Sequence, residues 1–427
     1  MIQGSPLLFI FLVIYGLRSL FLTILNRLNI AYLRHHGHEV PRVFLDTVDQ
    51  GKLAQMSAYA VDLAGLSLVT SLFSQGLFLL VLLSGVLPWF AHEISALTQN
   101  PVATGLIFLG VLSVLLNLPN VAFDLYETFV IEDRYGFNTQ TLRIWFSDLI
   151  KGVTISAVLG VILLSVLLLL ISKTPRIWWA LAWLALGALE LLLLWLYPVV
   201  IAPWFNKFEP IARQELENRI HQLVKGADFS IKGVFQVDAG KRSHHTNAYF
   251  AGIGRTKRVV LFDTLLASHR DDEILAILAH ELGHYRKQHI LKQLMAIEVL
   301  SFLGLFVASK LLGSPLLYHT FGFHHPMSYL GLFLVGTLMD LAGFFFRPFG
   351  SALSRKFERE ADDAVLDLMG TAVPFVRALK RLAVDNLANL NPHPLYARFH
   401  YSHPPLVERI ERLDRLENEK GVRPGHG

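Results

Sequence analysis

Two histidines and a glutamate that lie within five residues give the clearest chemical signal in this chain, the run His280-Glu-Leu-Gly-His284. Residues four apart project from one face of a helix, so the rings of His280 and His284 can bind one metal ion. Glu281 follows the first ligand and reaches a water molecule at the metal rather than the metal itself. The spacing predicts a zinc-dependent hydrolase in which Glu281 is the general base.

A catalytic zinc site of this kind needs a third protein ligand, because three ligands plus water is the usual arrangement. No third histidine follows at the spacing H-E-x-x-H-x-x-G-x-x-H. His289 stands five residues beyond His284, which is about 140° around a continuous helix. We therefore interpret His289 as a histidine at the membrane interface and not as a ligand.

Carboxylates beyond the last apolar stretch offer the missing ligand. Glu358 and Asp362 are four residues apart and share one helical face, whereas Glu360 points about 200° away from Glu358. The simplest assignment makes Glu358 the ligand and lets Asp362 accept the far ring N–H of a zinc histidine. The alternative is an exposed acidic helix face that pairs with Arg355 and Arg359.

The composition excludes several classes of protein. Of the 427 residues, 53% are hydrophobic and 17% are charged, and the mean hydropathy of +0.45 is not that of a water-soluble protein. The absence of cysteine excludes disulfides, thiolate metal sites and thiol nucleophiles, so a metal has to bind histidine and carboxylate. A net charge of +4 is too small and too dispersed to indicate a nucleic-acid partner.

Long apolar stretches predict about seven membrane-spanning helices, since a span needs about 20 mostly apolar residues. The first lacks an early basic cluster and a small-residue cleavage site, so we expect a retained span rather than a signal peptide. The seven stretches are residues 6–25, 63–90, 101–123, 152–172, 177–201, 290–312 and 327–347.

Four charged residues fall inside these spans, Arg18, Glu190, Glu298 and Asp340. Each would cost several kcal/mol if it faced lipid. We expect them to face a hydrated interior, and the alternative is pairing between helices in a dry bundle.

The loop charges orient the bundle, because Lys and Arg near span ends stay on the cytoplasmic side. Basic residues are frequent in the loops after the first and third spans and absent from those after the second and sixth, although Lys173 and Arg176 run against the pattern. Both large polar segments are then cytoplasmic. The membrane is either the endoplasmic reticulum or a bacterial inner membrane.

These observations predict an all-α polytopic membrane protein with a small α+β, zincin-like catalytic domain. We expect a transmembrane region with five spans, a first part of the catalytic domain, two further spans and a second part of the catalytic domain, at residues 1–201, 202–289, 290–349 and 350–427. Within the first catalytic part we expect a helix at 210–225, strands at 233–238 and 258–262, and a helix capped by Asp271 that runs to about His289.

Four motifs in order resemble those of the M48 membrane metalloproteases, specifically the CAAX prenyl protease 1 family of Ste24 type. They are Asn-Ala-Tyr-Phe at 247–250 followed by Arg-Val-Val-Leu-Phe-Asp-Thr-Leu at 258–265, the H-E-L-G-H core, the pair Glu358 and Asp362, and His400-Tyr-Ser-His-Pro-Pro405 running to Arg409. The resemblance covers most of the chain. Tyr285 departs from it, because many eukaryotic members carry Trp there.

The resemblance implies helices that enclose a large water-filled chamber, one Zn²⁺ per chain, and removal of the C-terminal tripeptide from a prenylated cysteine. The implied partners are a prenylated or otherwise hydrophobic C-terminal peptide and the lipid bilayer, and the oligomeric state is not indicated.

The resemblance also assigns roles to individual residues. Asn247, Ala248, Tyr249 and Phe250 look like the edge strand that pairs with an extended peptide, and the alternative is a buried turn. His403 and Arg409 look like the groups that stabilise the developing oxyanion. From pattern alone, they would be an ordinary pre-proline histidine and a charge on a helix surface.

Two other functions fit part of the pattern. A membrane quality-control protease similar to the HtpX proteases would use the same chemistry without a prenyl group, but those relatives are shorter and have fewer spans. A transporter or binding protein with a structural zinc site has no need of a base such as Glu281, and no inverted repeat is visible.

Overall fold

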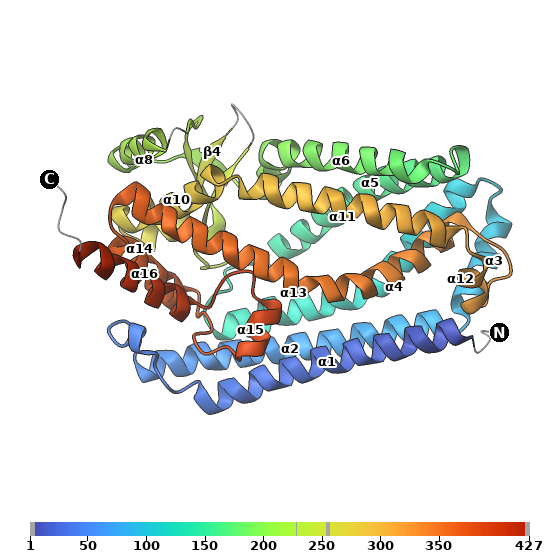
Figure 1. Cartoon of the computed structure of the whole chain (residues 1–427), viewed down its shortest axis with the longest axis horizontal. Coiled ribbons are helices and arrows are strands. Elements are labelled where there is room, and N and C mark those ends of the chain that lie inside the picture. Colours follow the sequence, from blue (N-terminus) through green and yellow to red (C-terminus); the bar gives the residue numbers. More distant parts are fainter. Residues whose placement is uncertain (1–4, 228, 253–256, 423–427) are drawn as a thin grey trace.

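The computed structural model describes residues 5–227, 229–252 and 257–422. Seven helices in this part of the chain are long and apolar enough to cross a membrane, which confirms the predicted number of spans. They lie roughly along the long axis of the molecule (Figure 1). These helices are α1 (Pro6–His36), α2 (Gln50–Leu83), α4 (Pro101–Tyr126), α5 (Leu142–Lys173), α6 (Trp178–Leu196), α11 (His289–Leu312) and α13 (Ser328–Met369).

The second predicted span is too long at its carboxyl end. Helix α2 ends at Leu83, and Gly85 adopts a left-handed conformation with φ of 82°. Glycine takes this conformation without steric cost, so the chain turns there and α3 (Val86–Leu97) begins as a separate helix. An uninterrupted apolar run does not reveal such a break, because hydrophobicity alone carries no information about backbone direction.

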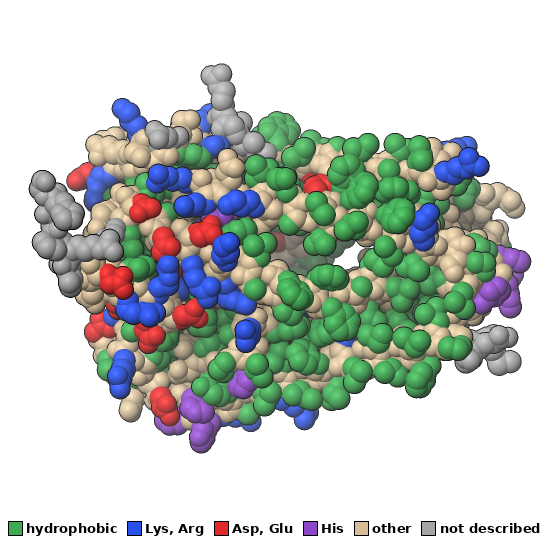
Figure 2. Space-filling model, in the orientation of Figure 1, with side chains coloured by type: hydrophobic (Ala, Val, Ile, Leu, Met, Phe, Trp, Pro, Cys, Tyr) green, Lys and Arg blue, Asp and Glu red, His purple; other side chains and the backbone are tan. Residues whose placement is uncertain are grey.

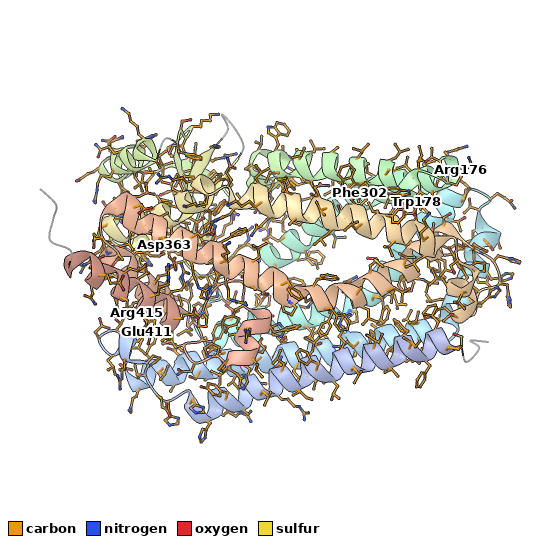
Figure 3. The ribbon with its side chains drawn as sticks, in the orientation of Figure 1. Arg176, Trp178, Phe302, Asp363, Glu411 and Arg415 are labelled. Carbon is orange, nitrogen blue, oxygen red and sulfur yellow. The ribbon has the colours of Figure 1, made fainter. Side chains whose placement is uncertain are left out.

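The surface divides into an apolar part and a charged end. Hydrophobic side chains cover the side of the helical part seen in Figure 2, and Lys, Arg, Asp and Glu gather at the end that holds the catalytic domain. A hollow opens between α11 and α13 in the middle of the apolar part (Figure 2). Asp363, Glu411 and Arg415 lie at the charged end, and Arg176 lies at the opposite end (Figure 3). This distribution is typical of a helix bundle that crosses a bilayer, with the charged domain outside the hydrocarbon region.

Two of the four charged residues inside the spans form an ion pair between helices. Arg18 Nη1 of α1 lies 2.5 Å from Asp340 Oδ2 of α13. Glu298 of α11 lies against Gly187 of α6, where a Cβ would stand 3.0 Å from Glu298 Oε1. The contact between Arg18 and Asp340 fits the alternative of pairing between helices, although the Asp340 side chain is 59% exposed.

A four-stranded sheet with the order β1-β2-β4-β3 forms the core of the catalytic domain. Its strands are β1 (Phe208–Pro210), β2 (Val234–Val237), β3 (Ala248–Ala251) and β4 (Arg258–Phe262). Strands β2 and β4 are parallel and the other pairs are antiparallel. The apolar centre of β4 is fully buried, as expected for an inner strand. Both strands predicted from sequence are confirmed.

The helix predicted at 210–225 begins later than expected. Pro210 ends β1, and α8 (Gln214–Gly226) starts four residues further on. The prediction was wrong at this end because Pro210, although compatible with a first helical turn, also fits an edge strand.

The remaining elements complete the polar domain and the span connections. They are α7 (Ala202–Phe205), α9 (Asp263–Ser268), α10 (Asp271–Arg286), α12 (Pro315–Thr320), α14 (Val373–Asp385), α15 (Pro394–His400), α16 (Leu406–Val422), the 3₁₀ turns Arg42–Phe44 and Ala239–Lys241, and the π-helical turns Glu127–Glu132 and Tyr197–Ile201.

Candidate metal centre

Helices α10 and α13 are held together at the point where the metal-binding side chains face each other. Gly283 of α10 packs against α13, and a Cβ there would stand 2.8 Å from the side chain of Ala364 and 3.0 Å from the backbone of Ala361. Only glycine allows this approach, because any larger residue would push the helices apart. The close contact brings Glu358 and Asp362 of α13 within reach of the two histidines on α10.

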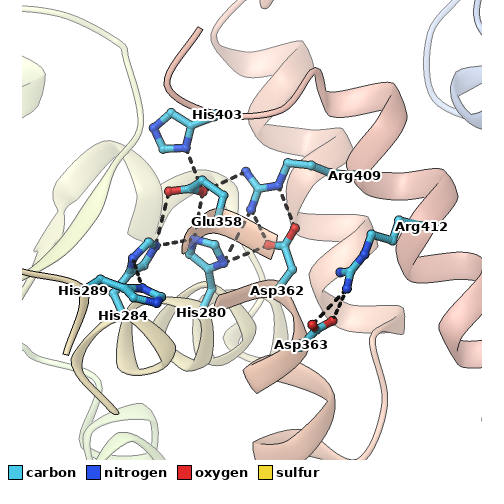
Figure 4. A network of polar contacts seen from close by, with 9 residues as sticks. All are labelled: His280, His284, His289, Glu358, Asp362, Asp363, His403, Arg409 and Arg412. Carbon is cyan, nitrogen blue, oxygen red and sulfur yellow. Dashed lines mark hydrogen bonds and ion pairs between the residues drawn. The ribbon is translucent and has the colours of Figure 1, made fainter. Parts of the chain in front are cut away.

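Three ligand atoms converge between these helices (Figure 4). His280 Nε2 and His284 Nε2 are 3.2 Å apart. Glu358 Oε2 lies 3.4 Å from His280 Nε2, and Oε1 lies 3.3 Å from His284 Nε2. Ligand atoms about 2.0–2.1 Å from a tetrahedral zinc ion stand about 3.3 Å from one another. The three side chains therefore fit a single zinc-sized ion.

A buried carboxylate supports the first histidine from behind. Asp362 Oδ1 lies 2.9 Å from His280 Nδ1, the ring nitrogen that does not face the ligand cluster. Arg409 binds the same carboxylate twice, with Nη2 at 2.6 Å from Oδ1 and Nε at 3.1 Å from Oδ2. All three side chains are buried. This contact holds the ring of His280 in one orientation and favours a free Nε2 lone pair.

The pKa values of two neighbouring residues on α10 are shifted by their surroundings. Burial alone lowers the pKa of His280, but hydrogen bonds with Asp362 and Glu358 raise it to about 9 overall. A metal ion binds the neutral ring and has to displace that proton. Burial raises the pKa of Glu281, although His280 and His284 oppose the effect. A carboxylate with a raised pKa is a stronger base at neutral pH.

His403 and Arg409 occupy different environments in this cluster. His403 precedes α16, its side chain is 60% exposed, and its Nδ1 lies 2.8 Å from Glu358 Oε2. Arg409 is 7% exposed, and its Nη1 lies 3.7 Å from Glu358 Oε2. The guanidinium of Arg409 is mainly engaged with Asp362, so His403 is the more accessible group at the mouth of the site.

The segment Asn247–Phe250 lies beside the metal-binding helix. Strand β3 is at the end of the sheet order, and the ring of Phe250 packs 5.5 Å from that of Tyr285, which follows His284. Asn247 precedes the strand, and its side chain accepts a hydrogen bond of 2.8 Å from Ala248 N–H. The segment is an edge strand and not the buried turn that was the alternative.

Comparisons with known proteins identify the family. The model of the CAAX prenyl protease N-terminal region, with five membrane helices, matches residues 29–207, and that of peptidase family M48 matches residues 210–417. CAAX prenyl protease 1 homolog from Arabidopsis thaliana is 34% identical over 88% of this chain and 90% of its own length. The chain belongs to the CAAX prenyl protease 1 family.

Other members support the same relationship. CAAX prenyl protease 1 from Saccharomyces cerevisiae is 35% identical over 79% of this chain and 77% of its own length. The crystal structure of S. mikatae Ste24p matches with a TM-score of 0.89 at 30% identity and covers 96% of this chain and 100% of that one. This member of the family is thus an integral, multi-pass membrane metalloendopeptidase, and the transporter interpretation is no longer needed.

Two predictions about α10 are wrong. Arg270, not Asp271, is the N-cap residue, and its N–H donates to the Glu273 carboxylate at 2.9 Å. The helix ends at Arg286 because Gln288 adopts a left-handed conformation with φ of 56°, after which α11 begins at His289. The chain therefore turns before His289, and an angle counted along a continuous helix does not apply.

His289 is consequently not an interfacial histidine. Its side chain is 1% exposed, and its Nδ1 lies 3.0 Å from His284 Nδ1. Its Nε2 lies 3.0 Å from Glu360 Oε2. Glu360 does face away from the ligand Glu358 along α13, as predicted, but this direction brings it to His289. Spacing missed both residues, because the left-handed turn at Gln288 brings His289 to His284 and the packing of α13 brings Glu360 to His289.

A second polar cluster was also missed. His245 Nε2 lies 3.1 Å from Glu132 Oε2, and its Nδ1 lies 3.0 Å from Asn386 Oδ1. Glu132 ends the π-helical turn after α4 and also binds the hydroxyl of Tyr59. His245 is 113 positions from Glu132 and 141 from Asn386 in the sequence, and Tyr59 is 73 positions from Glu132. No local pattern indicates such contacts, so the sequence offered no signal for this cluster.

Proposed function

We propose that this protein is a zinc endopeptidase that removes the C-terminal tripeptide from prenylated CAAX proteins or peptides. The observation that carries the proposal is the convergence of His280 Nε2, His284 Nε2 and a Glu358 carboxylate at tetrahedral ligand separations. One Zn²⁺ per chain is the expected cofactor, because two imidazoles and one carboxylate with an open position are typical of catalytic zinc.

Glu281 is the general base in this proposal. Zinc, when bound, would polarise the scissile carbonyl and acidify a water molecule. Glu281 takes the proton of that water as it attacks the carbonyl carbon and then gives it to the leaving amine. Burial raises the pKa of the Glu281 carboxyl, which makes its carboxylate a stronger base toward the attacking water.

His403 and Arg409 stabilise the reaction in different ways. His403 is exposed at the mouth of the site, so its ring can donate a hydrogen bond to the oxygen on which negative charge develops. Arg409 is saturated mainly by Asp362. We propose that Arg409 holds Asp362, and that Asp362 in turn holds the ring of His280. The positive charge of Arg409 also favours the negative charge that develops on the carbonyl oxygen.

The substrate peptide is proposed to add to the edge of β3. Asn247 C=O accepts from Phe262 N–H at 3.1 Å. Because backbone groups of successive residues face opposite edges of a strand, those of Tyr249 also face β4, and those of Ala248 and Phe250 face the open edge. An extended peptide can pair with these groups if it displaces the Asn247 side chain from Ala248 N–H.

A lipid-modified substrate fits the rest of the molecule. The relatives from plants and yeast carry the name CAAX prenyl protease 1. The hollow between α11 and α13 opens through an apolar surface (Figure 2), which offers an apolar place for a prenyl chain. We also propose that this end, built from residues 202–289 and 350–427, is cytoplasmic, with residues 1–201 and 290–349 forming the membrane region.

Matched peptides test the substrate assignment. Purified full-length protein is incubated with a farnesylated CAAX peptide and with the same peptide without the lipid, each with and without a chelator. The proposal predicts cleavage that depends on the lipid and is abolished by the chelator. Equal cleavage of both peptides would favour the quality-control alternative, and cleavage that survives complete removal of metal would reject the zinc mechanism.

A backbone-modified series tests the strand assignment without altering the protein. Each N-methylated amide removes one donor, and a hydrogen bond is worth about 0.5–1.5 kcal/mol. Methylation at alternate residues beside the scissile bond should lower kcat/KM about 2- to 12-fold, and methylation at the intervening residues should have little effect. A flat response along the peptide would reject strand addition.

A further inference from the structure

The second zinc histidine is supported by a pair of residues that no motif assigns. His289 lies at the start of α11, beside His284 (Figure 4), and Glu360 lies on α13. The contacts run from Glu360 Oε2 to His289 Nε2 at 3.0 Å and from His289 Nδ1 to His284 Nδ1 at 3.0 Å. They form a continuous chain of hydrogen bonds that ends on the ring of His284.

The direction of these hydrogen bonds follows from the chemistry of the ring. If Nε2 of His284 gives its lone pair to a metal, the proton of this neutral ring has to be on Nδ1. That N–H can only donate, so Nδ1 of His289 has to accept, and its own proton has to be on Nε2. This second N–H faces Glu360, a carboxylate that accepts. Only one set of tautomers satisfies all three residues together with a bound metal.

The position of His289 is fixed by packing as well as by hydrogen bonds. Its side chain is 1% exposed, and its ring stacks on that of Phe357 at 4.2 Å with an angle of 12° between the planes. Glu360 is partly exposed, and Lys356 Nζ lies 3.9 Å from its Oε1. A ring held from one side by stacking and from both nitrogens by polar partners has little freedom to rotate away from His284.

The arrangement parallels the support of the other histidine. His280 Nδ1 meets the Asp362 carboxylate directly, at 2.9 Å, and His284 Nδ1 meets a carboxylate through one additional ring. We propose that His289 and Glu360 are positioning residues that set the tautomer and orientation of His284 and thereby the metal affinity. This inference rests on the proposed zinc site.

Three substitutions at position 289 separate a positioning role from a packing role. His289→Asn keeps an acceptor oxygen near the place of Nδ1. His289→Gln carries its amide near the place of Nε2 and leaves nothing for His284 to donate to. His289→Phe keeps the ring and the stacking on Phe357 but removes both nitrogens. His269→Phe is the matched control, because His269 is also buried but its Nδ1 faces Ser268 and Asp385.

The measurement is the zinc affinity of each purified full-length protein, obtained by competition with a chelator. Loss of a residue that supports a metal ligand weakens binding about 10- to 100-fold, so we expect this loss for His289→Gln and His289→Phe. His289→Asn and the control His269→Phe should bind within about threefold of the wild type, well below the range expected for loss of a supporting residue. The absorption spectrum of bound Co²⁺ should change in the first two variants and not in the latter two.

Two results would overturn the inference. Wild-type affinity in both His289→Gln and His289→Phe would show that the ring of His284 needs no partner, and a loss in His289→Asn with wild-type affinity in His289→Phe would assign the effect to packing. Glu360→Ala, at a partly exposed position, provides an independent test and should also weaken binding. Failure of the wild-type protein to bind zinc would instead reject the proposed function.

Discussion

His280 and Asp362 are joined behind the metal-facing side of the imidazole, with Nδ1 at 2.9 Å from Oδ1. The same carboxylate accepts two hydrogen bonds from the buried guanidinium of Arg409. Asp362 thus connects a histidine on α10 with a cation on α16 through α13. The metal site and the packing of the last helix depend on one side chain.

Asp362→Ala should therefore weaken both folding and metal binding. It leaves Arg409 buried without its partner, which costs about 3–5 kcal/mol of stability, and removes the support of His280, which costs about 10- to 100-fold in zinc affinity. Thermal unfolding and chelator competition measure the two effects. Asp363→Ala is the neighbouring control, because its ion pair with Arg412 is partly exposed and is worth about 1 kcal/mol or less. Equal losses in both variants would contradict this account.

Glu281→Gln should abolish most of the activity without loss of metal. The amide cannot take a proton from water, and general-base catalysis is worth about 10²- to 10⁴-fold in rate. The rate of peptide cleavage and the zinc content of the same preparation are the measurements, with Glu215→Gln on the exposed face of α8 as the control. Cleavage at the normal rate by Glu281→Gln would reject the assignment of the base.

His403→Ala should lower kcat rather than metal content. Removal of a donor to a developing oxyanion costs about 10²- to 10³-fold in kcat, whereas the ligand set of His280, His284 and Glu358 stays complete. Steady-state kinetics with a saturating peptide tests this, and Ser402→Ala is the adjacent exposed control. An effect confined to KM would assign His403 to substrate binding instead.

The contact between His245 and Glu132 predicts a stability that depends on pH. Asn386 Oδ1 also accepts from Thr246 N–H at 3.0 Å, so both nitrogens of His245 face acceptors and only the protonated ring satisfies them. Burial alone lowers the pKa of His245, but the hydrogen bonds with Glu132 and Asn386 outweigh it and the pKa is raised.

The sign of this dependence follows from linkage. Since the folded-state pKa lies above the unfolded value of about 6.5, the stabilisation is complete below about pH 6.5 and is lost as the pH rises through the folded-state pKa. The unfolding midpoint of the wild type should fall over this interval. His245→Gln should remove that part of the fall, and the exposed neighbour variant His244→Gln should retain it. Identical profiles for all three proteins would contradict the prediction.

Local patterns predicted those features that depend on local chemistry. Apolar length was sufficient for the seven spans, and the four-residue spacings of His280 with His284 and of Glu358 with Asp362 place these pairs on their helical faces. Backbone reversals were not predictable, since Gly85 and Gln288 interrupt runs with continuous helical character. The support of His284 by His289 depends on such a reversal, so no periodicity could have revealed it.

Contacts between distant segments were predictable only where the chemistry of a shared metal ion required them. Glu358 was assigned to the ligand set because zinc needs a third donor, whereas nothing in the sequence connects Glu132 with His245. Tertiary packing alone determines that pair.

Metal analysis of the purified full-length protein and of Glu358→Ala tests the central claim most directly. The account predicts one zinc ion per chain in the folded wild-type protein and a large loss in the variant, because only two of the three ligands remain. A folded wild-type protein without any divalent metal, or an undiminished zinc content in Glu358→Ala, would contradict it.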